Sequence, residues 1–246
     1  MADPKPLLEV EGLSIGYTDE PVVRDFSAAI PAGTIATIIG PNGAGKSTLL
    51  GALYGLGRRF GGRIVFDGHE IQHLAPPERL KRGIGLVPQG RCNFPLMSVR
   101  ENLELGTYSL ARAAARPAVE SMLGLFPILK TRWRVRAGDL SGGEQQILEM
   151  AMVLAAGPRL LLLDEPSLGL SPGNQRQVLR TIEEIRTGGV TVLMVEQNAA
   201  AALRISDTAM VLELGRKVLE GPARRILDDP AVQAAYLGAG TGEPVA

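Results

Sequence analysis

The stretch "GPNGAGKST", residues 40–48, decides the fold of this chain. Gly40, Gly45, Lys46 and Ser47 fit the pattern G-x-x-x-x-G-K-[ST], in which glycines let backbone N–H groups face a phosphate. Lys46 places a positive charge on the β and γ phosphates, and the Ser47 hydroxyl can bind Mg²⁺. The stretch therefore predicts a nucleotide-binding loop, with phosphate contacts expected from Gly40, Pro41, Asn42, Gly43, Ala44, Gly45, Lys46, Ser47 and Thr48.

The segments on either side of this loop alternate between strand-like and helix-like patterns. The apolar run 33–40 predicts a buried strand, and residues 46–55 predict a helix whose positive end faces the anion. Further strands are expected at 7–17, 22–30, 62–68, 83–89, 159–166, 190–197 and 208–215, and further helices at 98–110, 116–129 and 141–156. The alternation predicts one α/β domain over residues 1–246, with a helical subdomain at about 93–156 and a flexible tail at 238–246.

The composition excludes several classes of protein. Lys plus Arg is 26 and Asp plus Glu is 26. The chain therefore lacks the basic excess that would suggest a nucleic-acid partner. Cys92 is the single cysteine, which rules out an internal disulfide, and we expect it to be a passive loop residue. Neither a signal peptide nor an apolar run of roughly 20 residues is present, which predicts a cytoplasmic protein that reaches a membrane only through a partner.

Two carboxylates end the apolar strand "LLLLDEP". Asp164 can hold Mg²⁺ directly or through water, and Glu165 can orient or deprotonate an attacking water. The alternative is a polar turn that merely closes a strand. Ligands of open α/β sheets bind at the carboxyl ends of strands, and this strand follows a phosphate loop, so we favour the catalytic interpretation.

The stretch "LSGGEQQ", residues 140–146, is the most distinctive in the chain. Ser141 as N-cap and Glu144 three residues later form a capping box for the following helix. That explanation leaves Gly142 and Gly143 unaccounted for, because glycine at a helix start costs backbone entropy. N–H groups without neighbouring side chains would suit close approach to a phosphate.

Taken together, "GPNGAGKST", "LVPQG", "LSGGEQQ", "LLLLDEPS" and "VEQN" resemble, in sequence order and over nearly the whole chain, the ATP-binding subunits of ABC transporters. The resemblance implies a P-loop NTPase fold, specifically an ABC-type nucleotide-binding domain with an antiparallel β subdomain and an inserted helical subdomain. It also implies ATP and Mg²⁺ as ligands and ATP hydrolysis coupled to transmembrane transport.

The same resemblance assigns roles to single residues. Tyr17 would stack on adenine, and Gln89 would reach Mg²⁺ and the attacking water while coupling the site to the helical subdomain. Gln197 would face the γ-phosphate in the place of a switch histidine. The signature residues Ser141, Gly142 and Gly143 would contact a nucleotide held by a second copy or a paralogue, which makes a head-to-tail dimer part of the mechanism.

The resemblance is narrower still in the stretches "EPSLGLSP", "VPQGR", "FPLMSVRENL", "LSGGEQQ", "VEQN" and "AYLG". These resemble the ATPase subunits of branched-chain amino acid importers, in which two different ATPases serve two membrane permeases and a periplasmic binding protein. The chain would then lie on the inner face of the membrane through the permeases. ATPases of urea or short-amide importers are closely similar, so the substrate stays open between them. Two other functions remain as alternatives: a nucleotide-dependent dimerisation switch with little hydrolysis, and a soluble ATPase acting on DNA or ribosomes.

Three positions depart from the broad family pattern. Glu144 stands where the signature commonly has Gln, at a helix N-terminus that favours a carboxylate. Ser171 stands where Asp is frequent, which removes a negative charge from the expected dimer seam. Gln197 can donate a hydrogen bond to a phosphate, but it can neither become cationic nor relay a proton as histidine can.

Overall fold

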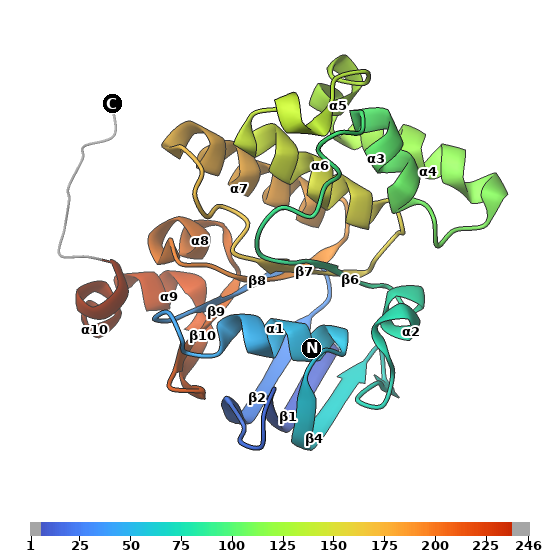
Figure 1. Cartoon of the computed structure of the whole chain (residues 1–246). Coiled ribbons are helices and arrows are strands. Elements are labelled where there is room, and N and C mark those ends of the chain that lie inside the picture. Colours follow the sequence, from blue (N-terminus) through green and yellow to red (C-terminus); the bar gives the residue numbers. More distant parts are fainter. Residues whose placement is uncertain (1–5, 238–246) are drawn as a thin grey trace, which may run out of the picture.

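The computed structural model describes residues 6–237, so the expected tail at 238–246 lies outside the described residues. A six-stranded sheet runs through the middle of the molecule in the order β10-β9-β3-β8-β7-β6 (Figure 1). Its strands are β3 (Ile35–Ile39), β6 (Ile84–Val87), β7 (Leu160–Asp164), β8 (Thr191–Val195), β9 (Thr208–Glu213) and β10 (Arg216–Pro222). All neighbouring pairs are parallel except β9 and β10. The α/β expectation is therefore confirmed.

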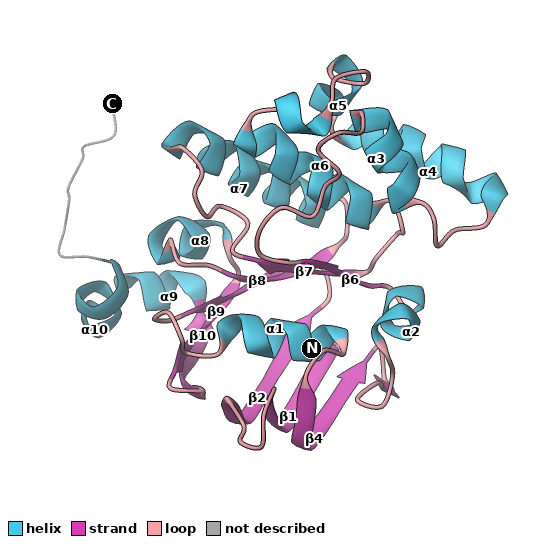
Figure 2. Cartoon of the chain, in the orientation of Figure 1, coloured by secondary structure: helices cyan, strands magenta, loops and turns pink. Residues whose placement is uncertain are grey.

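A second, antiparallel sheet in the order β2-β1-β4-β5 lies below the first in Figure 2. It consists of β1 (Pro6–Gly16), β2 (Val23–Pro31), β4 (Arg58–Phe66) and β5 (His69–Glu70). The helix α1 (Lys46–Tyr54) lies between the two sheets and buries Leu49, Leu50 and Leu53 against both. This apolar layer fixes the start of α1, and with it the phosphate loop, at the edge of the central sheet.

The other face of the central sheet is covered by helices (Figure 2). These are α3 (Val99–Gly106), α4 (Arg112–Leu125), α5 (Pro127–Thr131), α6 (Gly142–Leu154) and α7 (Pro172–Thr187). The short 3-10 helix Ala137–Asp139 precedes α6. Their apolar sides share one core with β7 and β8. The sequence predicted one helix over 116–129, but the structure divides it at Phe126, because Pro127 has no N–H to continue the helix and instead starts α5.

Shorter helices complete the fold at the edges of the sheets. They are α2 (Pro76–Lys81), α8 (Ala199–Ile205), α9 (Ala223–Asp228), α10 (Pro230–Val232) and the π-helix Gln233–Leu237. The sequence analysis did not predict α2, β5 or β10. α2 has six residues and β5 has two, which are too few to show a clear period, and β10 (RKVLEGP) has no buried residue and no apolar run. Within residues 6–237, none of the helices has the length and apolar character needed to cross a bilayer.

The strand order brings distant motifs together. β8, the strand that ends at "VEQN", pairs with β3 on one side and β7 on the other. Parallel strands end at the same edge of a sheet, so the segments after β3, β7 and β8 meet there. That edge holds the phosphate loop, the Asp164–Glu165 pair and Gln197.

Candidate nucleotide-binding site

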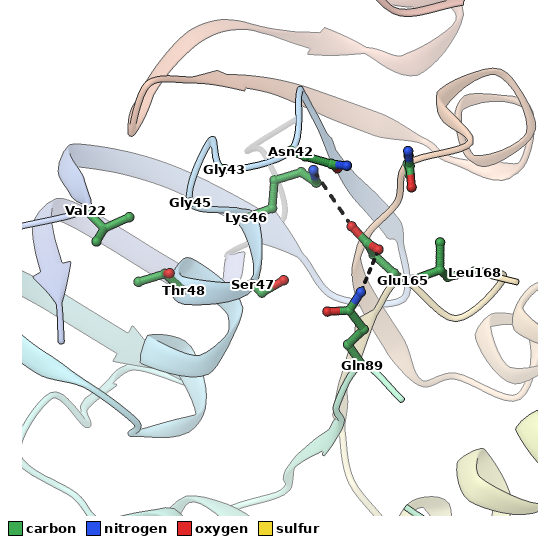
Figure 3. Close-up of a pocket in the computed structure, with 11 residues that line it drawn as sticks. Val22, Asn42, Gly43, Gly45, Lys46, Ser47, Thr48, Gln89, Glu165 and Leu168 are labelled. Atoms are coloured by element: carbon green, nitrogen blue, oxygen red, sulfur yellow. Dashed lines mark hydrogen bonds and ion pairs between the residues drawn. The ribbon is translucent and has the colours of Figure 1, made fainter. Parts of the chain in front are cut away.

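A pocket of about 550 Å³ lies at this edge of the sheet, in front of the N-terminus of α1 (Figure 3). The residues that line it are Val22, Asn42, Gly43, Gly45, Lys46, Ser47, Thr48, Gln89, Glu165, Leu168 and Gln197. The pocket thus brings together residues from the phosphate loop, from the segment after β7, from the "VPQG" segment and from the "VEQN" segment. The sequence analysis missed Val22 and Leu168, since an apolar residue in a loop gives no sign of lining a ligand site.

The backbone of the phosphate loop requires glycine. Gly45 caps α1 at φ 97°, in the left-handed region, and it offers no side-chain hydrogen bond to the first turn. A Cβ at Gly45 would lie 2.8 Å from Val23 Cγ2, and one at Gly40 would lie 2.1 Å from the Leu212 carbonyl oxygen. The first N–H groups of a helix lack intrahelical acceptors, and here they open onto the pocket. The loop can therefore hold an anion through its backbone.

Lys46 is buried, with its ammonium group folded back onto the loop. It donates to the carbonyls of Gly40 at 2.9 Å and Pro41 at 3.2 Å, and it lies 3.9 Å from Glu165 Oε1. The side chains of both ion-pair members are less than 10% exposed. A nucleotide phosphate would offer this ammonium a stronger acceptor than neutral carbonyls.

Ser47 and Asp164 form an oxygen pair at the start of α1. The Ser47 hydroxyl donates to Asp164 Oδ1 at 2.8 Å across 117 residues of chain. Burial raises the pKa of Asp164 above its ordinary value, partly offset by the Ser47 hydrogen bond and the charge of Lys46. A hydroxyl and a carboxylate with no soft ligand beside them suit the hard-oxygen preference of Mg²⁺, so the pair fits that ion.

Glu165 stands in the left-handed region at φ 50°, a conformation that costs a non-glycine residue about 1–3 kcal/mol. Its backbone N–H donates to the Val195 carbonyl at the end of β8, which holds it there. Its Oε2 accepts from the Gln89 side-chain amide at 3.0 Å, while Oε1 faces Lys46 (Figure 3). The strained turn thus directs this carboxylate into the pocket, between Lys46 and Gln89.

The end of β8 is fixed by a buried acid that the sequence analysis did not assign. Glu196 is 2% exposed, and its carboxylate accepts from the backbone N–H groups of Ser167 at 2.9 Å and Gln197 at 3.2 Å. Burial raises its pKa, against the effect of these hydrogen bonds. Glu196 thereby ties the Gln197 turn to the segment that follows Glu165, while the exposed Gln197 lines the pocket.

The signature residues lie away from this pocket, at the start of α6. Ser141 Oγ accepts from the Glu144 N–H at 3.3 Å, and Glu144 accepts from the Ser141 N–H at 2.8 Å, so the capping box is present. Glu144 also pairs with Arg132 at 3.1 Å. Packing within the chain itself explains why both positions are glycine. A Cβ at Gly142 would lie 2.9 Å from Leu170 Cδ2, and one at Gly143 would lie 3.0 Å from Asn174 Cγ.

Two further predicted positions sit at the margins. Tyr17 follows β1, is 61% exposed and is not among the residues that line the pocket. Ser171 is the N-cap of α7, where its side chain makes no capping hydrogen bond. Of the predicted phosphate-loop positions, Gly40, Pro41 and Ala44 shape the loop but do not line the pocket.

A family model described as "ABC transporter" matches residues 23–168, which include the phosphate loop, the signature and the Asp164–Glu165 pair. The chain belongs to the ABC transporter family. It is an ATP-binding subunit of a transporter, and its activity is ATP hydrolysis coupled to transport. Subunits of this kind form dimers and join membrane permease components.

Among its relatives, the high-affinity branched-chain amino acid transport ATP-binding protein BraG of Pseudomonas aeruginosa is 42% identical, covering 94% of this chain and 100% of the relative. The probable branched-chain amino acid transport ATP-binding protein LivF of Archaeoglobus fulgidus is 36% identical, covering 94% of this chain and 99% of the relative. The lipopolysaccharide export ATP-binding protein LptB of Escherichia coli K12 is 33% identical over 94% and 97%. The relatives therefore include both amino acid transport and lipopolysaccharide export proteins.

Solved structures agree with the fold. An ATP-binding cassette of an ABC transporter in its ADP conformation has a TM-score of 0.81 at 27% identity, covering 95% of this chain and 99% of the other. The cbiO1 protein of Clostridium perfringens, part of the ABC transporter complex cbiONQ, has a TM-score of 0.83 at 26% identity, covering 94% of each chain.

Proposed function

We propose that this chain hydrolyses ATP to drive a branched-chain amino acid importer, through the pocket that Lys46, Asp164 and Glu165 share. The observation that supports the chemistry most is the arrangement of Glu165, aimed into a phosphate-binding pocket between Lys46 and Gln89. The substrate rests on the identity to the BraG and LivF proteins. Urea and short amides remain the competing substrates.

In the proposed reaction, the loop N–H groups and Lys46 hold the β and γ phosphates of ATP. Ser47 and Asp164, with Gln89 as a further ligand, would hold Mg²⁺, which would neutralise phosphate charge when bound. Glu165 takes a proton from a water whose oxygen bonds to the γ-phosphorus as the bond to the ADP oxygen breaks, giving ADP and inorganic phosphate. The Gln197 amide donates a hydrogen bond to the γ-phosphate and senses its loss.

A second subunit completes the site. Ser141 is exposed, and neither it nor Gly142 nor Gly143 lines the chain's own pocket, which supports a head-to-tail dimer in which the start of α6 approaches the partner's nucleotide. Tyr17 would stack on adenine from the loop after β1. ATP closes the dimer and hydrolysis reopens it, and the permeases respond to that motion at the inner face of the membrane.

A groove of about 460 Å³ gives the permease a place to bind. It lies between α2, α3 and α6 and is bordered by Pro88 next to Gln89. Three of its apolar side chains are exposed: Phe94 (49%), Leu105 (39%) and Tyr108 (91%). Exposed apolar side chains gathered at a hollow mark a protein contact, so we assign this groove to a cytoplasmic segment of the permease.

The test compares ATP turnover of the wild-type chain with that of Glu165→Gln, which keeps the side-chain shape. A general base contributes about 10²–10⁴-fold, or about 2.7–5.5 kcal/mol of barrier, so turnover should fall by that factor while ATP binding persists. Glu120→Gln, an exposed carboxyl on α4, is the matched control. Equal turnover in wild type and Glu165→Gln would remove Glu165 from the chemistry.

The substrate is tested by uptake in a strain that lacks this gene. Labelled leucine, urea and a short amide are compared, with the wild-type gene restored as the control. Loss of leucine uptake alone supports the proposal. Loss of urea or amide uptake with normal leucine uptake would reassign the importer.

A further inference from the structure

Helix α6 carries a buried acid, Glu149, that accepts hydrogen bonds from the loop that follows Gln89. Glu149 is 1% exposed. Its Oε1 accepts from the backbone N–H groups of Cys92 at 3.1 Å and Asn93 at 3.3 Å, and from the Asn93 side-chain amide at 2.6 Å. One carboxylate oxygen therefore fixes the chain three and four residues after Gln89 to the helix that begins with the signature.

The other oxygen of the same carboxyl, Oε2, lacks a hydrogen-bond partner among the described residues. Glu149 Oε2 is buried and has no N–H or O–H donor in the described part of the chain. The Cys92 thiol contacts the carboxyl, but a thiol is a weak donor. Burial and the neighbouring Glu149 raise the pKa of that thiol to about 12. A buried polar atom without a partner is costly, and such atoms frequently mark a place that another group fills.

Glu149 also borders the docking groove defined above. The other described residues that line this groove are apolar, aromatic or small, apart from the Cys92 thiol, so Glu149 is the only carboxyl among them. A cation entering the groove would find an acid already held in place by three hydrogen bonds on one oxygen. Charge complementarity thus favours a partner segment with apolar side chains around one arginine or lysine.

We propose that Glu149 receives an arginine or lysine of the docked permease segment and so links that segment to the Gln89 loop. Glu149 is a positioning residue: it touches neither the nucleotide nor the attacking water, and acts through the backbone of Cys92 and Asn93. The inference rests on the proposed function, because it requires a permease in the groove. Movement of the docked cation would pull on the loop that holds Gln89 against Glu165.

The test uses the chain assembled with its second ATPase subunit and two permease subunits in lipid vesicles, beside the isolated chain. Glu149→Gln removes the charge and keeps a side-chain oxygen for the Cys92 and Asn93 N–H groups. We expect the permease-dependent rise in ATP turnover to shrink at least tenfold, with the KM for ATP within twofold of wild type. Glu149→Asp should recover part of the rise, and Glu120→Gln should behave as wild type.

Two measurements separate this role from a purely structural one. Amide hydrogen exchange at Cys92 and Asn93 should stay slow in Glu149→Gln, and become fast in Glu149→Leu, which has no acceptor. Equal stimulation of wild type and Glu149→Gln would overturn the inference, as would an equal loss of turnover in the isolated chain and the complex. A wild-type complex with no stimulation over the isolated chain would instead refute the proposed coupling to a permease.

Discussion

The two signature glycines allow a test that separates packing from phosphate contact. Gly143 is buried, and an alanine Cβ there would lie 3.0 Å from Asn174 Cγ and 3.1 Å from Asn174 Cβ. A Cβ cannot rotate away, so α6 and the first turn of α7 must separate by a few tenths of an ångström. Overpacking of this kind costs about 1–3 kcal/mol, offset by about 0.5–1 kcal/mol because alanine suits a helix better than glycine.

Gly124 provides the matched control, since it lies inside α4 with nothing within 4 Å of an added Cβ. Gly124→Ala should stabilise the protein by about 0.4–1 kcal/mol. The two variants should therefore differ by about 1–3 kcal/mol in free energy of unfolding. For a chain of this size, that separates their midpoints of thermal unfolding by on the order of 5 °C.

Gly142→Ala distinguishes the second role. Its Cβ would meet only the far end of the Leu170 side chain, which can turn aside, so its stability should stay within about 1 kcal/mol of wild type. If the N–H groups at the start of α6 approach a partner's nucleotide, Gly142→Ala should still lose ATP-dependent dimerisation. Calorimetry and light scattering with ATP measure the two effects. A Gly143→Ala variant as stable as Gly124→Ala would refute the packing argument, and a Gly142→Ala variant that dimerises normally would refute the phosphate contact.

Three other predictions follow from the site and from Glu149. Lys46→Ala should weaken ATP binding about 10–100-fold, because hydrogen bonds to a charged group contribute about 1.5–3 kcal/mol; titration with a fluorescent ATP analogue measures it. Gln197→His should keep turnover within tenfold, since an imidazole can donate the same hydrogen bond; a large loss would show that the amide itself is required. Burial raises the folded-state pKa of Glu149 above its ordinary 4.5, so its stabilising contribution is complete below about pH 4.5 and is lost as pH rises through the folded value. Glu149→Gln should therefore gain stability relative to wild type as the pH rises above about 4.5 in urea unfolding; a difference that is constant with pH would contradict this.

Much of the fold was predictable because its signals are local. The strand before Gly40 and the helix after Gly45 follow from apolar period and from glycine in the turn between them. The strands β1 and β2 and the capping box at Ser141 were expected for the same reason. The break between α4 and α5 was missed, because the apolar period continues across Phe126 and outweighed the proline that follows it.

The sequence by itself determined that the chain binds a nucleotide phosphate. Gly40, Gly45, Lys46 and Ser47 lie within one short loop, so the local backbone alone sets the spacing at which they contact the phosphate. It also located Asp164 and Glu165 at a strand end. Only the tertiary structure decided what these groups meet: Gln89 reaches Glu165 across 76 residues because β6 and β7 are neighbours in the sheet.

Tertiary packing likewise requires glycine at position 143, because a Cβ there would meet Asn174. It also brings Glu149 into hydrogen-bonding contact with the loop after Gln89. Glu149 had a signal in the sequence, as a lone acid in the apolar run of α6, but no local pattern names its partner. Contacts between elements depend on strand order and helix packing, which come from summed burial over the whole core. A motif therefore fixes which chemistry the chain contains, and the core fixes which of those groups can act on one another.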